Sequence, residues 1–185
     1  MFVFISGAAR SGKSAWAEKY ALSRVWGSRA PLVYLATARV CDQEMERRVL
    51  FHQEARKNKG FETLERDVDI AKAISRLAPS STVLLECLGT LLANEMFGRG
   101  RGRDRDKGEN TKVTAKIYEE LTLLRAKVAD LLVVSNDVFF DGVTYDEETE
   151  RYRQSLGALH VSLAWEADLA VECACGQARI ARQRG

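Results

Sequence analysis

Residues 2–14 read FVFISGAARSGKS, and this stretch decides the fold. The apolar run Phe2–Ser6 predicts a buried strand, and the pattern Gly7-x-x-x-x-Gly12-Lys13-Ser14 follows it directly. Glycines let the backbone wrap closely around a phosphate, and the amides of the loop and of the following helix supply partial positive charge. We therefore interpret this segment as a phosphate-binding loop (P-loop). Its nucleotide-binding candidates are Gly7, Ala8, Ala9, Arg10, Ser11, Gly12, Lys13 and Ser14.

Two of these residues carry the chemistry of a P-loop. Lys13 is expected to reach the β- and γ-phosphates of a nucleotide and to act in catalysis, and the Ser14 hydroxyl is expected to bind Mg²⁺. The motif does not say what accepts the phosphoryl group.

Outside the P-loop, apolar runs alternate with segments of helical spacing, which predicts an α/β fold. We expect a single P-loop domain over residues 1–185, with a mainly parallel sheet and helices on both of its faces. Strands are predicted at Leu32–Ala36, Thr82–Leu85, Asp130–Ser135 and Leu169–Cys173, with a short extended piece at Phe61–Glu65. Helices are predicted over residues 12–25, 43–59, 68–77, 88–97, 113–126 and 147–165.

Composition narrows the class of protein. A net charge of +2 does not favour a nucleic-acid partner, and no apolar run is long enough to cross a bilayer. A signal peptide is not expected at the N-terminus. The cysteines are interpreted as buried free thiols, which indicates a cytoplasmic protein: Cys41, Cys87, Cys173 and Cys175. The segment Gly98–Asn110 is rich in glycine and charge, so we expect a mobile surface loop, with phosphate contacts by its arginines as the alternative.

Ligands of parallel sheets bind beyond the carboxyl ends of the strands. The side chains to watch are therefore those that follow strands, namely Thr37, Glu86, Asn136 and Asp137. Glu86 is expected to bind the metal ion or the nucleotide; a solvated carboxylate at a strand end is the alternative.

The chain has two histidines. His52 shares a helical face with Arg48 and Arg56, and nearby cations favour the neutral, nucleophilic imidazole and attract an anion. A plain surface histidine explains the same pattern. His160 lies among leucines of the last predicted helix, for which we favour a structural role.

Together these residues resemble the bifunctional adenosylcobinamide kinase / adenosylcobinamide-phosphate guanylyltransferase family of cobalamin biosynthesis. The resemblance is closest in roughly the first hundred residues and includes the P-loop core GAARSGKS. Ala36-Thr37-Ala38 is similar to a family Ala-Thr-x segment, and Leu84-Leu85-Glu86-Cys87 is similar to its Leu-Leu-Glu-Cys segment. Met45, Arg48, His52 and Arg56 follow the family's order and spacing, and Thr63 and Glu65 match its Thr-x-Glu.

The resemblance implies a two-step enzyme. ATP or GTP would phosphorylate the aminopropanol hydroxyl of adenosylcobinamide, and GTP would then guanylylate a histidine that passes GMP to adenosylcobinamide-phosphate. That histidine falls on His52, whose neutral imidazole could attack the α-phosphorus. By the same resemblance, the nucleotide is held with the help of Ala36, Thr37, Ala38, Arg56, Glu65 and Glu86, and the protein is a homotrimer with active sites near subunit contacts.

The chain departs from the family pattern after Asn136-Asp137-Val138. Phe139 stands where the family commonly has a glycine-rich turn, and His160 stands where it has asparagine. Two rival functions stay open: a P-loop kinase of another small metabolite, which needs no histidine nucleophile, and a nucleotide-sensing or RNA-binding module that uses the basic loop.

Overall fold

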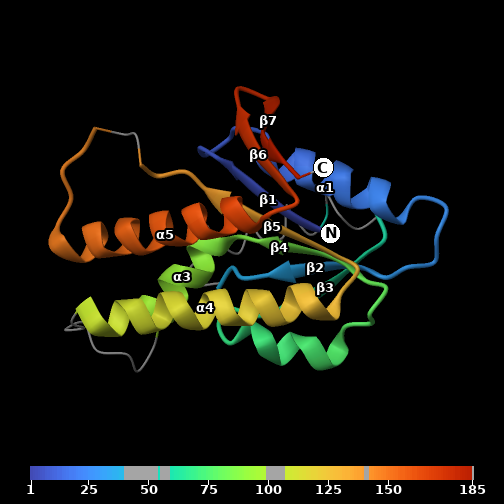
Figure 1. The fold of residues 1–185 in the computed structure, drawn as a ribbon, viewed down its shortest axis with the longest axis horizontal. Helices are drawn as coiled ribbons and strands as arrows, with labels where there is room; N and C mark the ends of the chain where they lie inside the picture. The colour runs from blue at the N-terminus through green and yellow to red at the C-terminus, as the bar shows by residue number, and fades with distance from the viewer. Residues whose placement is uncertain (40–53, 55–58, 99–106, 140–141, 185) are drawn as a thin grey trace.

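A computed structural model describes residues 1–39, 54, 59–98, 107–139 and 142–184. Its centre is a seven-stranded sheet in the order β3-β2-β4-β5-β1-β6-β7 (Figure 1). All neighbouring strands are parallel except β6 and β7, which form an antiparallel pair. The strands are β1 (Phe2–Gly7), β2 (Leu32–Ala36), β3 (Phe61–Glu65), β4 (Thr82–Glu86), β5 (Asp130–Asn136), β6 (Leu169–Ala174) and β7 (Gln177–Gln183).

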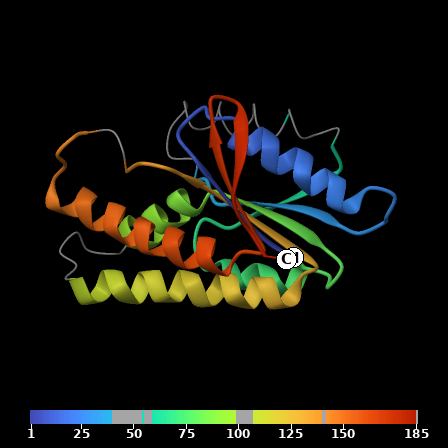
Figure 2. The ribbon, with the colours of Figure 1, turned by 45° about the horizontal axis from the view of Figure 1, so that its top comes forward.

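Helices cover both faces of this sheet. Figure 2 shows α1 (Lys13–Val25) on one face and α3 (Leu88–Phe97), α4 (Lys107–Lys127) and α5 (Glu147–Glu166) on the other. A short 3-10 helix, η1 (Ile70–Arg76), packs beside α4. This architecture confirms the predicted α/β class with a mainly parallel sheet.

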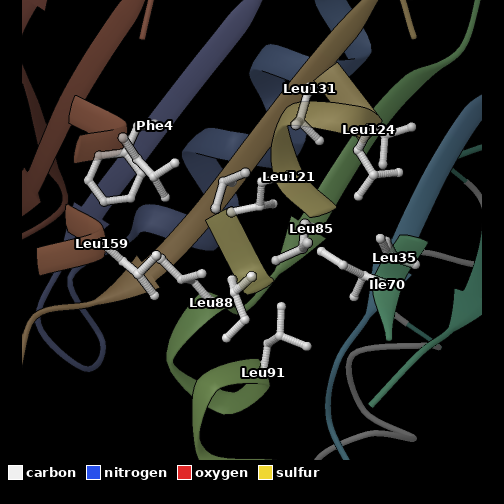
Figure 3. Packing of buried hydrophobic residues seen from close by; sticks show 14 of the residues in the cluster. Phe4, Leu35, Ile70, Leu85, Leu88, Leu91, Leu121, Leu124, Leu131 and Leu159 are labelled. Carbon is white, nitrogen blue, oxygen red and sulfur yellow. The ribbon is translucent and has the colours of Figure 1, made fainter. Parts of the chain in front are cut away.

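The alternation of side chains along the strands divides the apolar residues between the two faces. Val3 and Ile5 of β1 pack toward α1, whereas Phe2 and Phe4 pack into the larger core under α3, α4 and α5. Figure 3 shows this larger core, with Leu85, Leu121 and other leucines meeting between the sheet and the helices. Because both faces are buried, each central strand is almost continuously apolar.

Several predicted boundaries differ from the structure. The segment 68–77 is a 3-10 helix over Ile70–Arg76 and not an α-helix. Residues 107–110 of the predicted loop are the first turn of α4, since adding residues to the end of an established helix costs little. Residues 99–106 of that loop, and all but a few residues of the predicted helix 43–59, lie outside the described residues.

β7 was not predicted, because its sequence QARIARQ carries a single large apolar residue and its side chains are mostly exposed. The cysteine prediction was wrong for Cys175, which is exposed in the turn between β6 and β7; Cys173 is buried and Cys87 half-buried. Over the part of the chain that is described, no helix is both long and apolar enough to cross a membrane.

Candidate active site

The P-loop connects the carboxyl end of β1 to the first turn of α1. Its turn is closed by the Ser11 amide, which donates to the Ala8 carbonyl at 3.2 Å, and Arg10 and Gly12 take left-handed backbone angles, with φ of 60° and 91°. The Lys13 ammonium lies inside this turn and donates to the same Ala8 carbonyl at 3.2 Å. A concave loop with a buried ammonium at its centre can hold a polyphosphate.

Both glycines of the motif lie in close packing, and Gly12 also has a positive φ. A Cβ on Gly7 would collide with the carbonyl oxygen of Cys173 in β6. A Cβ on Gly12 would lie 3.2 Å from the Cα of Gly176, in the turn of the β6–β7 hairpin. The Gly176 amide also donates to the Ser11 carbonyl at 3.0 Å, so the β6–β7 hairpin packs against the P-loop and is hydrogen-bonded to it. This contact was not predictable from the local pattern, since β7 itself has no apolar pattern.

Glu86, at the carboxyl end of β4, reaches the P-loop. The Ser14 hydroxyl donates a short hydrogen bond to Glu86 Oε1, and the Tyr34 hydroxyl donates to Oε2 at 3.2 Å. A hydroxyl and a carboxylate side by side are oxygen ligands of the kind that Mg²⁺ prefers, so these two residues fit a magnesium ion. Tyr34 was predicted as a strand residue but not as part of the site; it lies two residues before the carboxyl end of β2.

Thr37 joins the ends of β2 and β4. Its hydroxyl donates to the Cys87 carbonyl at 2.8 Å and accepts from the Cys87 amide at 2.7 Å, while its own amide donates to the Glu86 carbonyl at 3.1 Å. The side chain is fully buried. Thr37 thereby ties the backbone of Glu86 and Cys87 to the end of β2, and its predicted contact with the nucleotide stays a prediction.

The other predicted nucleotide contacts lie farther along the same edge of the sheet. Ala36 pairs with Glu86 on one side and with Glu65 on the other, so these residues follow one another in a row. Glu65 is exposed and Ala38 half-buried. His52 and Arg56 lie outside the described residues.

A cavity of about 430 Å³ opens beside the P-loop. Ala8 forms its P-loop side and Asp137 follows β5. Tyr145 precedes α5, and Thr149 and Tyr152 lie in the first two turns of that helix. The Tyr152 hydroxyl donates to the Gly89 carbonyl at 3.2 Å, and burial raises the pKa of Tyr152 to about 12. Of these lining residues, Ala8 was predicted as part of the P-loop and Asp137 as a residue that follows a strand; the tyrosines carried no recognisable signal.

The two departures from the family pattern meet behind this cavity. The rings of Phe139 and His160 pack edge to face with their centroids 5.3 Å apart, and a Cβ on Gly157 would lie 3.6 Å from the Phe139 ring. His160 also bonds to the Ser135 hydroxyl at 2.7 Å and packs against Phe4. These contacts fit the structural role predicted for His160, and they show that the large Phe139 ring and the imidazole fill one space together.

Comparison with known proteins assigns the family. The sequence model of the family described as cobinamide kinase / cobinamide phosphate guanyltransferase matches residues 3–180. The chain belongs to this family. It is therefore an enzyme of the kinase and guanyltransferase type, as the resemblance predicted.

Named relatives agree with the assignment. The bifunctional adenosylcobalamin biosynthesis protein CobU of Salmonella typhimurium is 29% identical over 174 residues, which cover 91% of this chain and 92% of that protein. The protein named CobP of Pseudomonas aeruginosa, with the same description, is 32% identical over 161 residues, covering 86% and 85% of the two chains. Among solved structures, the flagellar accessory protein FlaH from Methanocaldococcus jannaschii matches with a TM-score of 0.46 and 10% identity, over 99% of this chain and 78% of its own.

Proposed function

We propose that this member of the cobinamide kinase family carries out both reactions of a bifunctional enzyme. In the first, ATP or GTP phosphorylates the aminopropanol hydroxyl of adenosylcobinamide. In the second, GTP transfers GMP to a histidine, and the GMP passes to adenosylcobinamide-phosphate to give adenosylcobinamide-GDP. Family membership supports the pair of activities, and the observation that carries the nucleotide chemistry is the P-loop that presents Lys13 and the Ser14–Glu86 pair together.

In this proposal the P-loop amides and Lys13 bind the phosphates of the nucleotide. Ser14 and Glu86 would hold Mg²⁺, which when bound neutralises charge on the phosphate oxygens. Tyr34 holds the Glu86 carboxylate beside Ser14 through its hydrogen bond to Oε2, and Thr37 fixes the backbone of Glu86 and Cys87.

His52 is proposed as the nucleophile of guanylyl transfer. A neutral imidazole attacks the α-phosphorus, pyrophosphate leaves, and one difficult transfer becomes two easier ones. The proposal rests on the resemblance and on the two arginines at helical spacing around His52.

The deciding experiment treats wild type, His52→Asn and Lys13→Ala with GTP labelled at the α-phosphate. We expect His52→Asn to lose protein-bound label while it keeps much of the phosphorylation of adenosylcobinamide, because that step needs no covalent intermediate. Lys13→Ala should lose both activities with an unchanged circular dichroism spectrum. Label retained on His52→Asn would refute the nucleophile assignment, and a wild type that accepts no label would favour a kinase without guanylyltransferase activity.

We further propose a cytoplasmic homotrimer, as the family resemblance implies. In the single chain, the apolar side chains of Val161 and Trp165, on neighbouring turns of α5, are 73% and 71% exposed. Such an exposed apolar pair is suited to a contact between subunits. Sedimentation equilibrium should give three times the monomer mass of 20.7 kDa. A monomer at micromolar concentration would refute the trimer without affecting the proposed reactions.

A further inference from the structure

The cavity next to the P-loop lies where a phosphoryl acceptor has to approach. Lys13 is the residue that reaches the β- and γ-phosphates in a P-loop, and its ammonium is 3.2 Å from the Ala8 carbonyl. Ala8 is also a wall of the cavity. A γ-phosphoryl group held by Lys13 therefore borders the cavity, which Asp137 also lines.

Asp137 is fixed at this position by its backbone. Its amide donates to the Gly7 carbonyl at 2.9 Å, which continues the pairing of β5 with β1 by one residue. The next two residues are held by Arg153, whose guanidinium donates to the carbonyls of Val138 at 3.2 Å and Phe139 at 3.0 Å. The loop that carries Asp137 is thus tied to both the P-loop strand and α5.

The Asp137 carboxylate has acceptor capacity to spare. In the described parts of the chain its hydrogen-bond donor is the Phe139 amide, at 3.1 Å from Oδ1. A carboxylate can accept about four hydrogen bonds, so it can also receive one from a ligand in the cavity. In those parts of the chain no salt bridge reaches it, and the three hydrogen bonds of the nearby Arg153 go to the two carbonyls and to Glu150.

The other polar groups of the P-loop, of Glu86 and of the cavity lining are less suited to take a proton. Both carboxylate oxygens of Glu86 already accept from hydroxyls, those of Ser14 and Tyr34. Tyr152 gives its proton to the Gly89 carbonyl, and Lys13 and Arg153 are cations. Asp137 is the carboxylate that shares the cavity with the P-loop.

We propose that this cavity receives the hydroxyl-bearing arm of the acceptor and that Asp137 is the general base of the kinase step. The inference rests on the proposed function and adds the residue that activates the acceptor. An oxygen lone pair of the acceptor alcohol forms the bond to the γ-phosphorus. The bond from that phosphorus to the bridging oxygen breaks, and its electrons leave with the nucleoside diphosphate. The alcohol proton passes to the Asp137 carboxylate and is later released to water.

The shape of the cavity fits a slim arm of a larger molecule. Its volume of about 430 Å³ is that of a small-ligand site, and the Tyr145 and Tyr152 rings provide an apolar wall for the carbon chain of an alcohol. The bulk of a corrinoid has to remain outside. Tyr145→Ala should therefore raise KM for the acceptor at least five-fold and leave KM for ATP within two-fold.

The test compares wild type, Asp137→Asn, Asp137→Glu and the exposed control Glu119→Gln on α4. Asparagine keeps an oxygen for the Phe139 amide but is not a base. We expect Asp137→Asn to reduce kcat for phosphorylation of adenosylcobinamide by about 100-fold or more, the usual contribution of a general base. Asp137→Glu should recover at least part of this loss. Glu119→Gln should match wild type.

The same proteins are assayed for ATP affinity and for label from α-labelled GTP. Both should be unchanged in Asp137→Asn, since neither needs the acceptor, and this shows that the variant is folded. A loss of less than ten-fold in kcat for Asp137→Asn, or an equal loss of ATP affinity and kcat, would overturn the assignment of the base. A wild type that binds ATP but does not phosphorylate adenosylcobinamide would overturn the proposed function itself, and the base with it.

Discussion

The imidazole of His160 is kept neutral by its surroundings. It lies between the rings of Phe4 and Phe139, with its Nε2 2.7 Å from the Ser135 hydroxyl. Burial lowers the pKa of His160 from 6.5 to about 4, against the opposing effect of the nearby Asp137 carboxylate. The folded protein therefore binds this proton less readily than the unfolded chain does.

This pKa difference predicts a loss of stability in mild acid. The unfolded chain takes up the proton near pH 6.5 and the folded protein near pH 4, so the free energy of unfolding falls as pH drops through that interval. The full effect is about 3 kcal/mol, of which about 2 kcal/mol appears between pH 7.5 and pH 5. His160→Asn should show a smaller decrease over this range in urea titrations. Equal pH dependence in the two proteins would contradict the prediction.

At the scale of the elements, one ammonium group joins three helices. Lys116 of α4 donates to Asp69, which precedes η1, and to Glu95 of α3, at 2.5 Å in each case. Glu95 is fully buried and also accepts from the Asp69 amide at 2.9 Å. With Lys72, this ammonium holds the pKa of Asp69 down to about 2. The loop that follows β3 is thereby fixed to the helices that cover the sheet.

Removing this ammonium should be costly. Lys116→Met takes away the cation that faces a buried carboxylate, which lowers the free energy of unfolding by about 3 kcal/mol. The double variant Lys116→Met/Glu95→Gln should recover at least about 1 kcal/mol, because a neutral amide is easier to bury and still accepts from Asp69. Lys112→Met, at an exposed position of the same helix, is the control. Chemical denaturation measures the stability of all three variants. A Lys116→Met protein as stable as the Lys112→Met control would contradict the stabilising role of the Lys116 ammonium.

The elements also show which features a sequence reveals. The strands β1, β2, β4, β5 and β6 were predictable because burial on both faces makes them continuously apolar. β7 was not, since an edge strand with exposed side chains needs no apolar pattern and is held by its backbone pairing with β6. In the site, the P-loop and Glu86 followed from motif and strand position. The partners supplied by distant segments, Tyr34, Tyr152 and Gly176, depend on tertiary contacts that local spacing does not encode.

In the whole molecule, strands from both ends of the chain meet at the P-loop. β1 lies between β5 and β6, and the β6–β7 turn closes over Gly12 from the C-terminal side. Figure 1 shows this hairpin beside β1 and α1. Gly12 therefore links the conformation of the P-loop to the packing of the hairpin.

Gly12→Ala tests this coupling. An alanine at this position would have an unfavourable left-handed φ. Its Cβ would lie only 3.2 Å from the Cα of Gly176, so the P-loop has to move. Gly27→Ala is a matched control, because Gly27 also has a positive φ, of 74°, but nothing within 4 Å of the added Cβ. Each variant should lose about 1–2 kcal/mol of stability from backbone strain.

The two variants should differ in their response to nucleotide. Wild type and Gly27→Ala should gain about 2.7 kcal/mol of stability at an ATP concentration about 100 times Kd, and Gly12→Ala should gain almost none. Thermal melts with and without ATP measure this. A Gly12→Ala protein stabilised as much as Gly27→Ala would show that the hairpin does not constrain the loop.

The turn that closes over the P-loop also carries a natural attachment point for an optical probe. Cys175 is exposed, its neighbour Gly176 is bonded to the P-loop residue Ser11, and the other described thiols are half-buried or buried. An environment-sensitive fluorophore on Cys175, in a chain with Cys41 replaced by serine, would sit at the rim of the phosphate site. Its emission would follow nucleotide loading and release in real time, and the two catalytic steps could then be timed separately in a stopped-flow instrument without radioactive substrate.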